Sequence, residues 1–104
     1  MRKYDIYLPL NYNDGEPIES TKITAICDEL ALTFGAITTS PLSAPYKGRW
    51  KYGGVEYVDQ IMKVEILTSG DRITKQFLKD FKERLKKDLR QIDILITTHG
   101  IQVI

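Results

Sequence analysis

Residues 4–10 alternate between apolar and polar or aromatic side chains, the pattern of a strand with one buried face. Ile6 and Leu8 are expected to point toward the core. Asp5 and Tyr7 fall on the opposite face of the same strand. The first element is therefore predicted to be half-buried, with a polar face on its outer side.

A helix is predicted next, after a segment rich in turn-forming residues at 11–17. Apolar positions recur there at helical spacing. Ser20 or Thr21 is expected to cap the helix, since a hydroxyl accepts from an unpaired first-turn N–H, and Gly35 to end it. The apolar stripe comprises Ile23, Ile26, Cys27, Leu30, Ala31 and Phe34.

The middle of the chain is predicted to form β-strands. Residues 36–39 form a short strand candidate, and the two prolines within 40–45 exclude regular structure there. Residues 48–52 and 55–68 are aromatic and β-branched runs separated by Gly53-Gly54. Because both glycines can adopt positive φ, this pair predicts a β-hairpin.

A second helix is expected to open at Asp71 or Ser69, followed by a last strand at 92–98 that Gly100 ends. In that strand Ile92, Ile94 and Ile96 would point inward, and residues 101–104 would form a short apolar tail. The helix stripe comprises Ile73, Phe77, Phe81, Leu85 and Leu89.

The order strand, helix, strand, strand, helix, strand predicts a single α+β domain over residues 1–104. The compact arrangement with right-handed crossovers is a ferredoxin-like sandwich, a four-stranded antiparallel sheet with both helices on one face. The first strand would then lie between the third and the last. This fold hosts many unrelated functions, so it does not by itself indicate one.

Composition narrows the class of protein. A net charge of +1 gives no global attraction to nucleic acid or to anionic membranes. No signal-peptide pattern follows the charged N-terminus, and no apolar run has the length of a membrane span, so a cytoplasmic protein without membrane contact is expected. Cys27 is the single cysteine; it fits a small buried side chain in a reducing compartment.

Two surfaces are candidates for binding. The outer sheet face would bring Asp5, Glu65 and Asp93 together near Lys63 and Tyr7. The hairpin interleaves aromatic with basic side chains. The predicted ligand-binding residues are Tyr7, Arg49, Trp50, Tyr57, Glu65 and Asp93. The competing interpretation is structural: an exposed sheet face needs polar residues, and hairpin aromatics often cover the end of a core.

The second helix also carries a basic stripe that is spaced for phosphate contacts. Interspersed acids and the near-neutral chain disfavour nucleic acid binding. His99 is the single histidine, and no nucleophile–histidine–acid arrangement, metal-binding motif or cofactor motif accompanies it. The stripe comprises Lys75, Lys79, Lys82, Lys86 and Arg90.

Five stretches carry a resemblance to known proteins: residues 13–17, Phe34-Gly35, residues 48–50, residues 81–86 and residues 92–97. In these stretches the chain resembles a group of small uncharacterised bacterial proteins. The resemblance implies a ferredoxin-like arrangement and a bacterial source such as a cyanobacterium. It implies no activity and carries over no site residue.

Three functions are therefore ranked. The first is a non-enzymatic binding or regulatory domain that acts through self-association or a protein partner, using the outer sheet face or the tail at 101–104. The second is a small enzyme or small-molecule-binding protein with a cleft between that face and the Trp50 hairpin, where Tyr7 or His99 would carry a proton and Glu65 or Asp93 would assist. The third is nucleic acid binding through the basic stripe.

Overall fold

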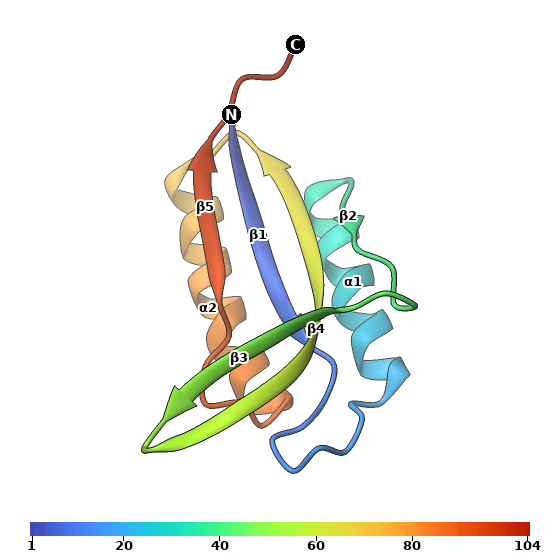
Figure 1. Cartoon of the computed structure of the whole chain (residues 1–104). Coiled ribbons are helices and arrows are strands. Elements are labelled where there is room, and N and C mark those ends of the chain that lie inside the picture. The colour runs from blue at the N-terminus through green and yellow to red at the C-terminus, as the bar shows by residue number, and fades with distance from the viewer.

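A computed structural model describes all residues, Met1–Ile104, as a five-stranded antiparallel sheet with two helices behind it (Figure 1). The elements are β1 (Arg2–Pro9), α1 (Ser20–Phe34), β2 (Thr38–Thr39), β3 (Tyr46–Tyr52), β4 (Val55–Thr68), α2 (Arg72–Asp88) and β5 (Ile96–Gly100). The strand order is β2-β4-β1-β5, with β3 also paired to β4. The α+β class and the central position of β1 are confirmed, whereas the expected four strands are five.

The fifth strand arises because β4 is long enough to take two partners along one edge. Its first half pairs with β3, from Tyr52↔Val55 to Tyr46↔Ile61, and Thr38 and Thr39 of β2 pair farther along, opposite Glu65 and Val64. Residues 40–45, which include two prolines, separate the two partners. The hairpin β3–β4 therefore extends beyond the end of β1 and passes in front of the other strands (Figure 1).

The core lies between the sheet and the helices. It is built from alternate residues of β1 and β4 and from the inner faces of α1 and α2. Fully buried side chains include Ile6, Leu8, Leu30, Val64, Ile66, Leu85 and Leu89. The inward alternation predicted for the first strand is confirmed.

The predicted ends of the helices are partly correct. Gly35 ends α1 with φ 83°, and Asp71 caps α2 by accepting a 2.7 Å hydrogen bond from the Thr74 N–H. The residue before α1 is Glu19, without a side-chain cap, so the expected capping by Ser20 or Thr21 is wrong.

The apolar stripe predicted for α2 is wrong at its first position. Ile73 is 80% exposed, because its position in the first turn faces away from the sheet, and Leu78 is buried instead.

The last strand is also shifted from its expected range. It runs from Ile96 to Gly100 rather than over 92–98. Ile94 is buried, but the chain at 91–95 is a loop that joins the sheet only through the Tyr7 N–H, which donates to the Leu95 carbonyl at 3.0 Å. This shift frees the loop to form a wall beside the hairpin.

Candidate ligand pocket

The hairpin that carries Trp50 is held in register by its turn. Gly53 and Gly54 have φ values of 57° and 81°, which other residues adopt only with strain. This two-residue turn places Trp50 directly opposite Tyr57 and diagonal to Asp59. The predicted hairpin is confirmed.

Trp50 is fixed from two sides. Its indole Nε1–H donates to Asp59 Oδ2 at 2.6 Å, and its ring stacks on Tyr57 with centroids 4.4 Å apart and planes 17° apart. Asp59 is only 8% exposed. Because the indole donor is neutral, this bond holds the side chain in place without neutralising the carboxylate.

A pocket of about 280 Å³ lies where this hairpin faces the outer side of the sheet. Tyr7 and Pro9 of β1 and Ile61 of β4 line its sheet side, and Trp50 and Asp59 line its hairpin side. The remaining lining residues are Gly48, Arg49, Gln91, Asp93, Ile94 and Leu95. The pocket thus combines two aromatic side chains, several aliphatic ones and two carboxylates.

Gly48 lines the pocket at a point where the backbone lies close to the Ile61 side chain. A Cβ atom at this position would come within 2.5 Å of Ile61 Cδ1. A larger residue would therefore push Ile61 aside or fill part of the pocket. This close approach is a physical reason for a glycine within a strand of aromatic and basic side chains.

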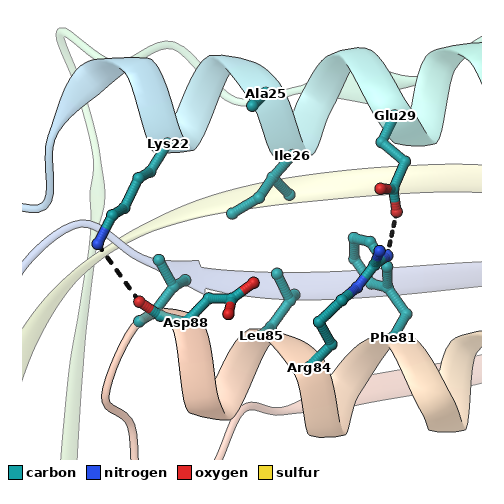
Figure 2. A pocket seen from close by; sticks show the side chains of 9 residues that line it. Lys22, Ala25, Ile26, Glu29, Phe81, Arg84, Leu85 and Asp88 are labelled. Carbon is teal, nitrogen blue, oxygen red and sulfur yellow. Dashed lines mark hydrogen bonds and ion pairs between the residues drawn. The ribbon is translucent and has the colours of Figure 1, made fainter.

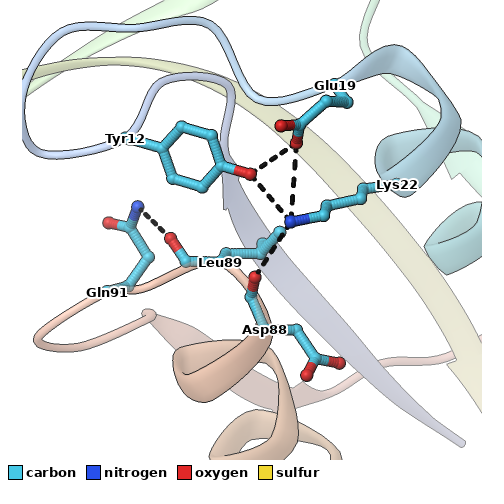
Figure 3. Close-up of polar contacts among 6 residues, drawn as sticks. All are labelled: Tyr12, Glu19, Lys22, Asp88, Leu89 and Gln91. Atoms are coloured by element: carbon cyan, nitrogen blue, oxygen red, sulfur yellow. Dashed lines mark hydrogen bonds and ion pairs between the residues drawn. The ribbon is translucent and has the colours of Figure 1, made fainter.

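The loop 91–95 forms the opposite wall, and the buried side chain of Gln91 anchors it. The Gln91 amide nitrogen donates to the Leu89 carbonyl at 3.0 Å and to the Asn11 carbonyl at 3.2 Å. Figure 3 shows the first of these bonds beside a second anchor, in which Lys22 Nζ donates to the Tyr12 hydroxyl at 2.9 Å.

The Tyr12 hydroxyl in turn donates to Glu19 at 2.5 Å. This bond, followed by the hydrogen bond within Glu19 itself and the charge of Lys22, lowers the pKa of Glu19. The contacts join the 11–19 segment to the end of α2 (Figure 3). They support the pocket wall from behind and do not face the pocket.

The pocket carries an uncompensated negative charge. Arg49 pairs with Glu56 at 2.7 Å, and Asp93 pairs with Lys82 at 3.2 Å, so each of these charges has a counterion. For Asp93, partial burial acts to raise the pKa, but the hydrogen bonds from Lys82 and the Ile94 N–H outweigh it and the pKa is lowered. Asp59 has no cationic partner within 4.0 Å.

Four of the six residues predicted to bind a ligand line this pocket: Tyr7, Arg49, Trp50 and Asp93. Tyr57 lies behind Trp50 and supports it by stacking. Asp93 was expected on the last strand and lies instead in the preceding loop. Asp59 and Gln91 were missed; the register of a two-residue turn could have found Asp59, whereas no local signal marks Gln91.

Glu65 lies elsewhere on the outer face, in a cluster of alternating charges. It contacts Lys3 Nζ at 2.7 Å and Lys63 Nζ at 3.3 Å, and Asp5 lies opposite it across the strands. The hydrogen bond from Lys3, with a smaller one from Lys63, lowers the pKa of Glu65. The expected grouping of Asp5, Glu65, Lys63 and Tyr7 is present, but Asp93 is not part of it.

Asp5 differs from the sequence expectation in its burial. It is 5% exposed, although it lies on the outer face, and the ammonium groups of Lys3 and Lys63 lie within 4.0 Å of its carboxylate. Its Oδ1 atom has no hydrogen-bond partner, and the nearest cation, Lys3 Nζ, is 3.7 Å away. The cluster has two acids and two lysines, and it forms a balanced network rather than a ligand pocket.

The helix layer contains a second hollow, a groove of about 290 Å³ between α1 and α2. Its floor is apolar, with Ile26 and Leu85 prominent, and a polar contact crosses it at each end (Figure 2). Arg84 pairs with Glu29 at one end, and Lys22 Nζ reaches the Asp88 carbonyl at 3.5 Å at the other. Because these contacts join α1 to α2 over an apolar floor, we interpret the groove as the seam between two packed helices.

The remaining titratable candidates lie away from the pocket. His99 is exposed on β5 opposite Lys3, and Cys27 is half-buried in α1, where burial raises the pKa of its thiol. No group of three or more His, Cys, Asp or Glu side chains is arranged to hold a metal ion. Neither helix has the length and hydropathy to span a membrane.

The comparisons with known proteins concern the fold. No family model and no curated protein sequence matches the chain. Among solved structures, it is similar to a phage SAM lyase in the apo state, with a TM-score of 0.65 and 12% identity over 94% of this chain and 78% of that one. A phage SAM lyase in complex with S-methyl-5'-thioadenosine gives a TM-score of 0.64 and 13% identity, over 95% and 80% of the two chains. At this identity the likeness establishes a shared fold.

Proposed function

We propose that this protein binds a small organic cation with a planar ring, of the S-adenosylmethionine class, in the Trp50 pocket. The observation that carries the proposal is Asp59, a buried carboxylate without a cationic partner beside the aromatic side chains of the pocket. The fold shared with a phage SAM lyase supports the choice of ligand class.

The chemistry of the lining explains why a cation is favoured. A sulfonium or ammonium centre is attracted both to a carboxylate and to the face of an aromatic ring. In a partly enclosed pocket such attraction is screened less than at the open surface. A neutral thioether such as S-methyl-5'-thioadenosine lacks the charge and is expected to bind less tightly.

If a reaction follows binding, Tyr7 is the proton carrier that the geometry favours, since it lines the pocket and His99 does not. Asp93 lies on the same pocket and Glu65 lies outside it. The experiment therefore measures both binding and product formation.

The test is isothermal titration of the purified protein with S-adenosylmethionine, S-adenosylhomocysteine and S-methyl-5'-thioadenosine, followed by chromatography for products. We expect the sulfonium ligand to bind most tightly, and Asp59→Asn to remove most of that preference while retaining the hydrogen bond from Trp50. Trp50→Phe should weaken all three ligands.

Tyr52→Phe is the matched control, because Tyr52 lies on the same hairpin, is exposed and is not among the pocket residues. Equal affinity of the wild type for charged and neutral ligands would contradict the role of Asp59. If none of the three ligands binds, the proposal is wrong.

The self-association hypothesis stays a separate prediction. The specific feature favouring it is the tail after β5, in which Val103 and Ile104 are exposed and the Ile101 N–H donates to the Met1 carbonyl at 3.0 Å. Native mass spectrometry of the intact chain and of a chain lacking 101–104 tests it; an unchanged mass distribution would exclude the tail.

The finer description of the fold is likewise proposed. We interpret β2 and β3 as two pieces of one ferredoxin-like strand, since both pair with the same edge of β4. Joining them by replacing residues 40–45 with a continuous strand sequence should leave the sheet order unchanged in a crystal structure.

A further inference from the structure

The outer edge of β5 is free. This strand ends the sheet order and has β1 as its single neighbour, so one row of its backbone N–H and C=O groups lacks a strand partner. Such an edge is a template for adding an extended peptide through main-chain hydrogen bonds. Figure 1 shows β5 at one side of the sheet, with α2 running behind it.

A groove of about 200 Å³ lies along this edge, between β5 and α2. Lys75, Lys79 and Lys82 line its helix side, and Thr97 and Thr98 line its strand side. Tyr4, Leu78 and Ile96 form the rest of the lining, so no carboxylate is among the lining residues.

Most of the positive charge in the groove is not neutralised by the protein itself. Neither Lys75 nor Lys79 has a carboxylate within 4.0 Å, and Lys82 pairs with Asp93 at 3.2 Å. Arg2 adds a further cation beside the strand, where its Nε–H donates to the Thr98 hydroxyl at 3.2 Å. The groove is therefore complementary to an acidic partner.

The spacing of Lys75 and Lys79 is close to the repeat of an extended chain. The helical rise puts Lys75 and Lys79 about 6 Å apart along α2, and Lys79 and Lys82 about 4.5 Å apart. Alternate side chains of a strand are about 6.6 Å apart and point to the same face of a sheet. A strand added to β5 would therefore present every second side chain to the lysine row.

We propose that the β5 edge and the lysine row of α2 together form a docking site for an acidic peptide segment, bound as an added strand with acidic residues at alternate positions. Backbone hydrogen bonds to β5 supply the orientation, and ion pairs with Lys75 and Lys79 supply the preference for acidic side chains. A nucleic acid would use the lysines but not the strand edge.

The test is fluorescence anisotropy with a labelled short peptide in which glutamate alternates with valine. The comparison probes are a peptide of the same composition with its glutamates consecutive, the alternating peptide with N-methylated backbone amides, and a single-stranded oligonucleotide. We expect the alternating peptide to bind most tightly. The double variant Lys75→Gln/Lys79→Gln should weaken it by up to about fivefold per lysine, as exposed ion pairs do.

Lys87→Gln is the matched control, because Lys87 is exposed on the same helix and is not among the groove residues. An unchanged affinity in this variant and a loss on N-methylation would support docking by strand addition. Equal binding of both peptide orders, or no effect of N-methylation, would overturn it, and tighter binding of the oligonucleotide would indicate a phosphate-binding surface instead. Absence of peptide binding at low salt would also overturn it.

Discussion

The hydrogen bond between Trp50 and Asp59 gives the most direct test of the pocket. The indole N–H donates at 2.6 Å to a carboxylate that is 8% exposed. Hydrogen bonds to charged groups contribute about 1.5–3 kcal/mol. Trp50→Phe removes the indole donor and leaves the Asp59 carboxylate buried without it. The loss of folding stability in this variant therefore includes the cost of a desolvated, unpaired charge. The stacking on Tyr57, worth about 0.5–1.5 kcal/mol, is largely kept by a phenyl ring.

A double-mutant cycle isolates this bond from the other losses. The variants are Trp50→Phe, Asp59→Ala and the double variant, and the expected coupling energy is about 1.5–3 kcal/mol. The double variant should thus be more stable than the sum of the single changes predicts. Urea unfolding should be followed by circular dichroism, because Trp50 is the single tryptophan and its removal abolishes that fluorescence signal.

The expected change in the free energy of unfolding is large enough to measure by urea unfolding. With a urea dependence of about 1.3 kcal/mol per molar for a chain of this size, a change of 2 kcal/mol shifts the midpoint by about 1.5 M. Tyr52→Phe, on the same hairpin, should leave the midpoint nearly unchanged. A coupling energy below about 0.3 kcal/mol would refute the reasoning, since it would mean that the bond does not hold the two side chains together in solution.

Three further predictions concern stability. Asp71→Ala should lower the free energy of unfolding by about 1 kcal/mol through loss of the α2 cap, whereas Asp71→Asn should retain most of it; equal losses in urea melts would contradict the capping role. Leu30→Ala should cost about 2–5 kcal/mol because the side chain is fully buried, and a thermal midpoint equal to the wild type would exclude Leu30 from the core. The lowered pKa of Glu65 means that its contribution is present above its usual pKa of 4.5 and is lost as the pH falls through the lowered value. Urea melts from pH 6 to pH 3 should therefore show the gap between wild type and Glu65→Gln closing toward the acid end, and a constant gap would contradict the pairing with Lys3.

The candidate pocket was partly foreseeable from the chain. The aromatic hairpin and the outward alternation of Tyr7 both indicated a cleft between the sheet face and Trp50, and a pocket lies there. The register of the two-residue turn also places Asp59 diagonal to Trp50, so the sequence could have identified this residue too. The role of the 91–95 loop was not foreseeable, because the run of alternating isoleucines predicts a strand and no local pattern marks where strand pairing with β1 stops.

The lysine row illustrates the same limit on α2. Sequence spacing identified a basic stripe of five positions but not which of them would lie beside the sheet edge. Packing of Leu78, Phe81 and Leu85 against the core sets the rotation of the helix. That rotation brings Lys75, Lys79 and Lys82 to β5.

The α+β class, the identity of most elements and some of their ends follow from the sequence, because these depend on local physics. Hydrophobic period separates helix from strand, Gly53-Gly54 permits the tight turn, Gly35 permits the left-handed end of α1, and Asp71 satisfies the first N–H groups of α2. Only the folded chain shows that β2 joins β3 on the same edge of β4, that Asp5 is buried on the outer face, and which charges stay unpaired. Those outcomes depend on contacts between residues far apart in the chain, whose free energies are set by packing and desolvation and leave no periodic trace in the sequence.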